Sequence, residues 1–339
     1  MDDDALTVAI VGATGLVGEE IVELLEERRF PMRAVRFLGS LKTAGKVFEQ
    51  HGHKETVALL GPQSFEGVDV ALFSAGPTVA GQFAPLAASA GAAVVDLSSR
   101  FRLDDTVPLV VPEVNASEIG NRAESGIVAT PSSTAVALSV VLAPLAQEAG
   151  LRRVIVSTYQ GAAGAARRGI NGLSRETMDL LASRGERLTR FPRRLAFNVI
   201  PQIGELEPGG HTSHERQVTA EVRKVLGDPG LALQVSAVRV PIFFGTGMSV
   251  VVETEQSLDV ERARAVLREA PGVLVSEELD DPYPTPAETA GSDATHVGRI
   301  REDLSLPGGL AFWVTIDNVR KGAALNAVQI AEILVRDYL

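Results

Sequence analysis

Three glycines near the start of the chain have a spacing that could bind a phosphate group. Gly12, Gly15 and Gly18 follow a short apolar run and precede a segment with helical spacing. Glycines there allow a tight turn and let a pyrophosphate approach the N–H groups at the start of a helix. The spacing GxxGxxG differs from the usual GxGxxG, so a purely structural turn is the alternative. The flanking pattern favours a dinucleotide site. Its loop residues are Gly12, Thr14, Gly15, Leu16, Val17 and Gly18.

The end of the second predicted strand indicates which dinucleotide binds. NAD sites usually place an acidic residue about 20 residues past the loop. No carboxylate lies between Phe37 and Lys46, whereas Ser40 and Lys42 offer a hydroxyl and a cation that suit a 2′-phosphate. The alternative for Ser40 and Lys42 is a solvated loop. The sequence therefore favours NADP over NAD.

Composition excludes several classes of chemistry and partner. The chain of 339 residues has no cysteine, which excludes disulfides, thiolate metal ligands and thiol catalysis. Its formal charge of −11 opposes binding to nucleic acid or an anionic membrane. The first residues, Met1 to Asp4, lack the features of a signal peptide, and no apolar run reaches the ~20 residues of a spanning helix. We expect a cytoplasmic protein.

The chain is long enough for two domains, and its hydrophobic pattern changes near residue 150. Before that point, nearly continuous apolar runs alternate with helical patterns, which is typical of a buried parallel sheet. The predicted strands are 6–11, 34–38, 68–74, 92–97 and 127–129, and the predicted helices are 16–28 and 78–90. The fold class expected is α/β, with a Rossmann-type doubly wound parallel sheet.

The second half of the chain predicts an α+β domain with a mostly antiparallel sheet. Its longer runs are rich in β-branched residues. The predicted strands are 151–160, 231–241, 248–255 and 310–316, the helices are 173–183, 217–226 and 322–338, and the Pro-rich segment 281–286 is a loop. We place a first domain at 1–132 together with a C-terminal helix, 320–339, and a second domain at 133–319. A free sheet face often pairs with a second copy, so we expect a homodimer through the second domain.

Two polar groups have both a chemical and a structural interpretation. Ser133, ahead of a helix at 135–142, could be a nucleophile at a positive helix end or simply an N-terminal cap. His211, His214 and Glu215 could bind a metal ion, but their spacing fits no metal signature. We favour a helix start for these three residues and expect no metal.

Five further motifs, in order along the chain, resemble those of the aspartate-semialdehyde dehydrogenase family. With the glycine loop, the matching segments are 74–76, 96–102, 107–115, 157–160 and 317–327. The resemblance covers nearly the whole chain. In this family, a cysteine thiolate attacks the aldehyde, the thiohemiacetal passes hydride to NADP, and phosphate releases the acyl group.

The resemblance also shows where this sequence departs from the family. Ser133 stands at the position of the nucleophilic cysteine, and Thr246 at that of the histidine base. A Glu-x-x-Lys pair that the family uses on substrate and phosphate falls on His214 and Gln217. A serine hydroxyl is a far weaker acid than a thiol and needs an adjacent base. A serine ester is also a poorer acyl donor to phosphate than a thioester.

Other residues keep the roles that the resemblance implies. Arg102 resembles a phosphate-binding arginine, Arg239 resembles the arginine of the substrate carboxylate, and Gln160 is retained at the catalytic site. The resemblance adds cofactor contacts at Ser74, Gly76, Ala163, Gly164 and Asn318.

The sequence thus predicts an NADP-binding member of the family that has lost dehydrogenase turnover and is similar to the family's Usg-type paralogues. We expect such a pseudoenzyme to respond to nucleotide as the partner of an active enzyme. The anion-binding arginines are compatible with a small anionic ligand. The alternatives are an active or residual NADP-dependent enzyme of aspartate-family amino-acid biosynthesis, a different reaction through Ser133, and a purely structural dimer.

Overall fold

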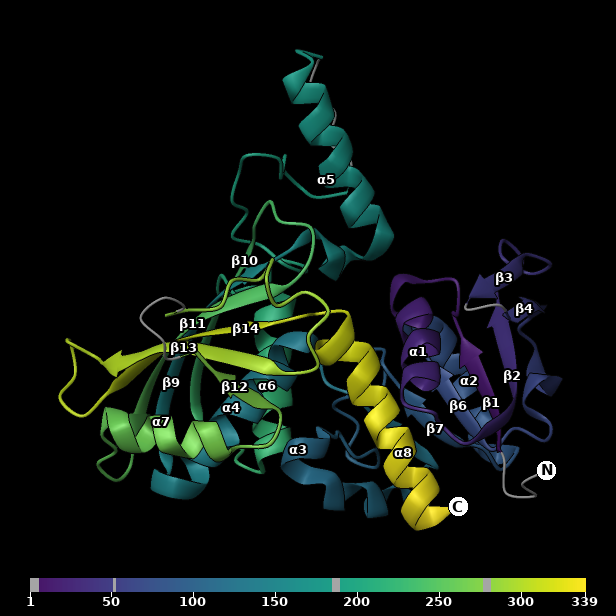
Figure 1. The fold of residues 1–339 in the computed structure, drawn as a ribbon, viewed down its shortest axis with the longest axis horizontal. Helices are drawn as coiled ribbons and strands as arrows, with labels where there is room; N and C mark the ends of the chain where they lie inside the picture. Colours follow the sequence, from purple (N-terminus) through teal and green to yellow (C-terminus); the bar gives the residue numbers. More distant parts are fainter. Residues whose placement is uncertain (1–5, 51–52, 185–189, 277–281) are drawn as a thin grey trace. The chain divides into compact units, whose positions relative to one another are not determined.

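The computed structural model describes residues 6–50, 53–184, 190–276 and 282–339 (Figure 1). The chain folds as two compact units. Unit 1 is Met1–Ser132 with Ala323–Leu339, and unit 2 is Ser133–Gly322. Unit 2 thus extends slightly beyond the limit expected from sequence, because the residues just before Ala323 pack with it.

Unit 1 contains a six-stranded sheet in which all pairings are parallel. The strand order is β5-β2-β1-β6-β7-β8. The strands are β1 (Leu6–Val11), β2 (Met32–Gly39), β5 (Ala58–Leu59), β6 (Val70–Phe73), β7 (Ala93–Asp96) and β8 (Ile127–Ala129). Because β2 and β6 flank β1 on opposite sides, the strand order reverses there. This is the switch point at which doubly wound sheets bind ligands, and it confirms the Rossmann-type fold class.

Three helices of unit 1 bury apolar side chains in its core: α1 (Leu16–Glu27), α2 (Pro77–Ser89) and α8 (Asn326–Tyr338). The short α3 (Pro112–Asn115) buries none. In α1, Ile21, Leu24 and Leu25 recur at helical spacing and are fully buried. Ile330 and Leu334 of α8 belong to the same core. The C-terminal helix is therefore an integral part of unit 1.

A two-stranded antiparallel hairpin interrupts the connection from β2 to β5. It consists of β3 (Val47–Gln50) and β4 (His53–Thr56). Phe48 of β3 is buried and packs against Phe37 of β2, with ring centroids 4.6 Å apart. The hairpin occupies the place in the chain where doubly wound folds usually have a crossover helix.

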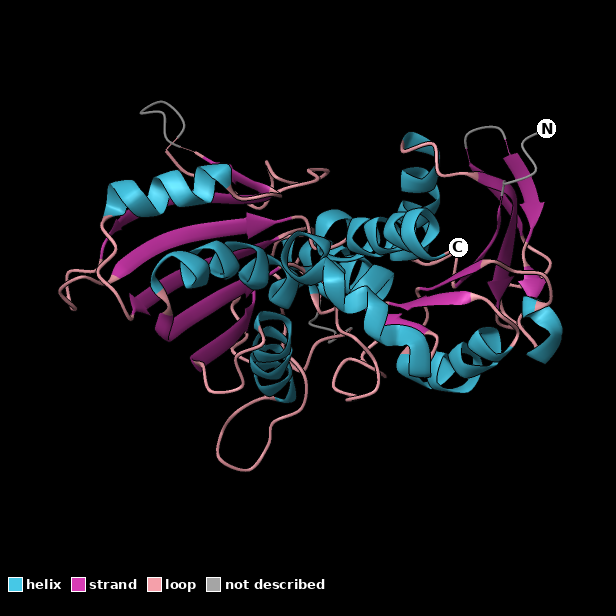
Figure 2. Ribbon diagram, turned by 90° about the horizontal axis from the view of Figure 1, so that it is seen from below, coloured by secondary structure: helices cyan, strands magenta, loops and turns pink. Residues whose placement is uncertain are grey.

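Unit 2 is built on a second six-stranded sheet, seen among the magenta strands of Figure 2. Its order is β10-β9-β11-β14-β13-β12. The strands are β9 (Leu151–Gln160), β10 (Ala232–Arg239), β11 (Thr246–Thr254), β12 (Val273–Val275), β13 (Thr295–Glu302) and β14 (Leu310–Ile316). The three central pairings are antiparallel and the two outer ones parallel. The expectation of a mostly antiparallel sheet is confirmed.

The helices of unit 2 are α4 (Ser133–Ala149), α5 (Ala166–Leu181), α6 (Ser213–Leu226) and α7 (Val260–Glu269). α4 packs against the sheet, α6 and α7, which explains why it is apolar around its whole circumference. Thr212 caps α6 in a capping box with Glu215, and Asp259 caps α7.

Several details differ from the sequence-based expectations. α5 begins at Ala166, well before the predicted start at 173, because small residues in its first turns carry little hydrophobic signal. The predicted final helix begins with a π-helical segment, Arg320–Leu325, before α8. β12, β13 and α7 were not predicted. Residues 1–4 and Asp281 of the Pro-rich segment lie outside the described residues, while Pro282 to Pro286 belong to no helix or strand. Within the described residues, no helix has the length and apolarity needed to cross a membrane.

Candidate active site

The glycine loop lies at the carboxyl end of β1 and leads into α1. Gly12 has φ +90°, a conformation that favours glycine. The Ser74 hydroxyl, just after β6, donates to the carbonyls of Val11 at 3.0 Å and Gly12 at 3.2 Å. A Cβ on Gly18 would lie only 2.3 Å from the Gly12 carbonyl oxygen. The close approach of loop and helix therefore requires glycine at this position.

The other predicted loop residues lie in the same turn. Thr14, Leu16 and Val17 are half-buried, and Val17 packs against the core of unit 1. Gly76 is the N-cap of α2, with open space around it. Because β1 and β6 are neighbouring parallel strands, the starts of α1 and α2 lie at the same edge of the sheet. Free N–H groups at two helix starts suit a pyrophosphate.

Ser40 and Lys42 lie in a turn directly after β2. The Ser40 carbonyl accepts hydrogen bonds from the N–H groups of Thr43 at 2.9 Å and Ala44 at 2.8 Å, which closes the turn. The side chains of Ser40 and Lys42 are both exposed. Since β2 pairs with β1 in parallel, this turn lies at the same sheet edge as the glycine loop. A hydroxyl and an ammonium without a carboxylate in the turn fit a phosphate group.

Arg102 is held by backbone carbonyls in unit 1. Its Nε donates to Thr130 O at 2.9 Å and its Nη2 to Leu97 O at 2.8 Å. Nearby, the fully buried Asp96 accepts from the N–H and hydroxyl of Ser98. Burial raises the pKa of Asp96, although these hydrogen bonds and the Arg102 charge oppose the shift. The guanidinium is thus fixed next to the chain that leads into Ser133.

In unit 2, the sheet register aligns three of the predicted residues. Gln160 ends β9 and pairs with Thr246 of β11 on one side and with Arg239 of β10 on the other. All three side chains are buried. Three strand ends thus place Thr246, Gln160 and Arg239 in one row.

Arg239 is a buried cation beside small residues. Its Nη1 donates to Gly161 O at 2.6 Å, and a Cβ on Gly164 would lie 2.6 Å from the same nitrogen. Burial lowers the pKa of Arg239 to about 10, and the charge of Arg190 adds to the shift. The group is still protonated at neutral pH. Among the described residues no carboxylate pairs with Arg239, so its charge is available to an anionic ligand.

His214 lies against Gln160. The Nε2 atoms of the two side chains are 3.0 Å apart, and Gln160 Nε2 also donates to Thr158 Oγ1 at 3.1 Å. An amide nitrogen can only donate, so with this amide orientation His214 Nε2 is the acceptor. Gln160 therefore links the imidazole to the row of strand ends.

Glu215 fixes the start of the helix that carries His214, a role that sequence reasoning missed. Its carboxylate accepts from the N–H of Thr212 at 2.7 Å and from that of Ala237, in β10, at 2.8 Å. These bonds join the start of α6 to the strand that carries Arg239. The Thr-x-x-Glu spacing of a capping box was the available signal. The expected helix start at His211 to Glu215 is confirmed, because Thr212 caps α6. Gln217 donates to the fully buried Glu221 at 2.6 Å.

Ser133 is the first residue of α4. A Cβ on Gly322 would lie 2.5 Å from Ser133 Cβ, so the backbone before Ala323 closes directly over this serine. No histidine among the described residues forms a hydrogen bond with Ser133 Oγ. In the described part of the chain, Ser133 is thus a serine at a helix start with no imidazole hydrogen-bonded to it.

The residues expected near a nicotinamide form one connected group in unit 2. Asn318 Oδ1 accepts from Gly245 N at 2.7 Å, and the Ala163 N–H donates to Phe243 O at 2.8 Å. Ala163 and Gly164 lie in the short 3₁₀ turn directly after β9. The described residues contain no group of three side chains suited to hold a metal ion.

Comparisons with known proteins agree with the division of the chain into units 1 and 2. Residues 7–122 match the model of the semialdehyde dehydrogenase NAD-binding domain, and residues 142–321 match that of the semialdehyde dehydrogenase dimerisation domain. The chain is 42% identical to an aspartate-semialdehyde dehydrogenase of Aquifex aeolicus (strain VF5) over 98% of both chains. It is 39% identical to the crystal structure of aspartate semialdehyde dehydrogenase II from Vibrio cholerae, with a TM-score of 0.95, covering 99% of this chain and 100% of that one. A probable aspartate-semialdehyde dehydrogenase from Pseudomonas aeruginosa is 34% identical, with a TM-score of 0.92, and the match covers 99% of this chain and 100% of that one. The chain belongs to the aspartate-semialdehyde dehydrogenase family.

Proposed function

We propose that this chain binds NADP and a small anionic ligand but has lost the covalent dehydrogenase step. The observation that carries the proposal is the absence of cysteine from all 339 residues. The family resemblance assigns the nucleophile's position to Ser133 and the base's position to Thr246. A threonine hydroxyl cannot take a proton from serine at neutral pH. The chain would then be a pseudoenzyme of the Usg type.

The covalent step would fail for two reasons. Attack on the aldehyde needs an alkoxide, and the hydroxyl of Ser133 has no imidazole hydrogen-bonded to it among the described residues. If an acyl-serine did form, phosphate would have to displace an alkoxide, which is a poorer leaving group than a thiolate. Both halves of the family reaction are therefore slowed by the same substitution.

The second candidate is an active or residual NADP-dependent aspartate-semialdehyde dehydrogenase of amino-acid biosynthesis. It is supported by the relatives with that name, which match nearly the whole chain at up to 42% identity. Ser133 at the positive end of α4 is the residue through which this chemistry would run. Overall similarity favours this candidate, whereas the residues at positions 133 and 246 favour the first.

Two further parts of the proposal concern cofactor and assembly. Ser40 and Lys42, in a turn without a carboxylate, support NADP as the dinucleotide. When bound, NADP would supply the hydride acceptor, while the chain's own residues bind its phosphates and orient it. The match to a dimerisation domain supports a homodimer through unit 2. A cytoplasmic role as the nucleotide-responsive partner of an active enzyme is consistent with both.

A turnover assay separates the two candidates. Purified protein is mixed with NADP, aspartate semialdehyde and phosphate, and NADPH absorbance is followed. We expect no turnover from the natural chain or from Ser133→Cys, and measurable turnover from Ser133→Cys combined with Thr246→His. Ser89→Cys, on an exposed surface of α2, controls for the mere presence of a thiol. Turnover by the natural chain would refute the first candidate and establish the second.

A thermal-shift measurement tests the cofactor independently of turnover. NADP should raise the melting temperature of the natural chain more than NAD does, because only NADP carries the 2′-phosphate. Lys42→Ala should remove that difference. An equal response to both dinucleotides would contradict the assignment of Ser40 and Lys42.

A further inference from the structure

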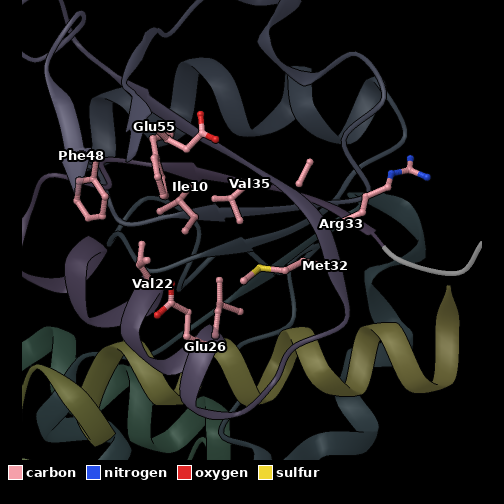
Figure 3. A pocket seen from close by; sticks show the side chains of 11 residues that line it. Ile10, Val22, Glu26, Met32, Arg33, Val35, Phe48 and Glu55 are labelled. Atoms are coloured by element: carbon pink, nitrogen blue, oxygen red, sulfur yellow. The ribbon is translucent and has the colours of Figure 1, made fainter. Parts of the chain in front are cut away.

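Unit 1 contains a cavity of about 210 Å³ that the proposed function does not use (Figure 3). It lies between α1, strands β1 and β2, and the β3–β4 hairpin, and we call it the hairpin cavity. Its lining residues are Ile10, Val22, Leu25, Glu26, Met32, Arg33, Ala34, Val35, Phe37, Phe48 and Glu55. No residue of the glycine loop is among them, so it is separate from the proposed dinucleotide site.

The cavity follows from the way the chain covers this part of the sheet. A crossover helix would place a continuous apolar stripe on β2, whereas among the described side chains of the hairpin it is Phe48 that packs there, tilted against Phe37. Ile10 and Leu25 form a fully buried apolar floor, while Met32 and Val35 remain half-buried. The space left over is lined mainly by hydrocarbon.

Two carboxylates are among the residues that line the hairpin cavity. Glu26 is half-buried on α1, and Glu55 is exposed on β4. Figure 3 shows them on either side of the apolar side chains, while the Arg33 guanidinium points away. Within the described part of the chain, neither carboxylate has a hydrogen-bond or ion-pair partner. Two acids around one apolar opening favour a cation in that space.

We propose that the hairpin cavity binds a small primary amine that carries an aromatic or branched apolar group. An apolar cavity of roughly 150 Å³ accepts a benzene ring, so the hairpin cavity has room for a ring and a short chain. The ring would lie among Ile10, Leu25 and the two phenylalanines. The ammonium would bind the half-buried Glu26 carboxylate through a charge-assisted hydrogen bond, and the negative charge of Glu55 would add a longer-range attraction. The inference does not depend on the proposed function.

The test is a titration of the full chain with 2-phenylethylamine, followed by ligand-observed NMR and calorimetry. 2-Phenylethanol and 3-phenylpropionate are the neutral and anionic controls with the same ring. We expect the amine to bind in the millimolar range or better, the alcohol about tenfold more weakly, and the acid not measurably. Raising the salt concentration should weaken binding of the amine only.

Variants locate the site. Glu26→Gln should weaken amine binding roughly tenfold while leaving the alcohol unchanged, because it removes one charge-assisted contact. Val35→Phe should abolish binding of both ligands by filling the cavity. Glu66→Gln, an exposed acid of the same unit outside the cavity, is the matched control and should bind like the natural chain.

Three outcomes would overturn the proposal. These are no amine binding at millimolar concentration, equal binding of amine and alcohol, and unchanged binding in both Val35→Phe and the double variant Glu26→Gln with Glu55→Gln. The double variant keeps the cavity's packing intact. It therefore decides the matter if Val35→Phe does not fold.

Discussion

Replacing Gly18 by alanine tests the geometry of the glycine loop. The new Cβ would lie 2.3 Å from Gly12 O and 2.8 Å from both Ala13 Cα and Ala13 O. Ordinary carbon–oxygen contacts are about 3.3 Å or longer, so loop and helix must separate by about 1 Å. All of these atoms are backbone atoms, so no side-chain rotation relieves the contact.

The expected cost can be set against one small gain. Overpacking of this kind costs about 1–3 kcal/mol, while alanine in a helix gains at most ~1 kcal/mol over glycine. The net loss of about 1–2 kcal/mol would lower the melting temperature by roughly 2–8 °C in a unit of this size. Displacing the loop N–H groups should also weaken NADP binding by about tenfold or more.

Differential scanning calorimetry and an NADP titration measure the two effects. Gly61→Ala is the matched control, because a Cβ there meets no atom within 4 Å. A Gly18→Ala protein that melts and binds NADP like the natural chain would refute the close approach of loop and helix. A stability loss with unchanged NADP affinity would leave the packing intact but contradict the assignment of the loop to the dinucleotide.

Three other substitutions have distinct expected outcomes. Gly164→Ala places a Cβ 2.6 Å from Arg239 Nη1, which is the movable end of a side chain, so the free energy of unfolding should change by less than about 1 kcal/mol. Binding of an aspartate analogue, measured by isothermal calorimetry, should weaken. Unchanged binding would contradict the role of Arg239. Glu215→Gln leaves one carbonyl oxygen to accept from two backbone donors, so urea unfolding should show a stability loss of about 1–3 kcal/mol. The control is Gln234→Glu on β10. A stability loss in Glu215→Gln no larger than in this control would show that the hydrogen bond to Ala237 contributes little. The pKa of Asp96 is raised in the native state, so the folded protein binds the proton of this carboxyl more tightly than the unfolded chain does. The contribution of Asp96 to stability therefore falls as the pH rises above about 3.8, the pKa of the group in the unfolded chain. Asp96→Asn lacks that loss, so its stability relative to the natural chain should increase between pH 4 and 7, whereas a decrease over that range would contradict the sign of the shift.

The sequence was most informative where one physical signal dominated. Nearly continuous apolar runs located β1 and β8 at their observed bounds, because strands that are buried on both faces must be apolar on both. Runs rich in β-branched residues did the same for β9 and β14. The glycine loop was recognisable because only glycine tolerates the contact at Gly18. Residue types at 133 and 246 bear directly on chemistry and need no structure to be read.

Other features depend on partners far away in the chain and were not predictable. His214 lies against Gln160 only because α6 docks on β10 through Glu215, a contact that joins residues on separate elements. β13 contains charged residues and a register shift between Gly298 and Arg301, so its sequence lacks the regular alternation of apolar and polar residues that would have indicated a strand. The hairpin cavity lies where the hairpin leaves part of the sheet uncovered. A gap between separate elements has no signal in the local sequence pattern, so it could not be predicted.

The return of the C-terminus into unit 1 has a consequence for biosynthesis. Val8 and Ile10 share one core with Ile330 and Leu334, and these two residues leave the ribosome only after all of unit 2. During translation, the sheet of unit 1 therefore lacks the helix α8 that covers one of its apolar faces until all of unit 2 has been synthesised. A nascent chain is therefore exposed to aggregation until α8 has emerged, and deleting the turns of α8 that carry Ile330 and Leu334 would leave that apolar side uncovered after synthesis as well.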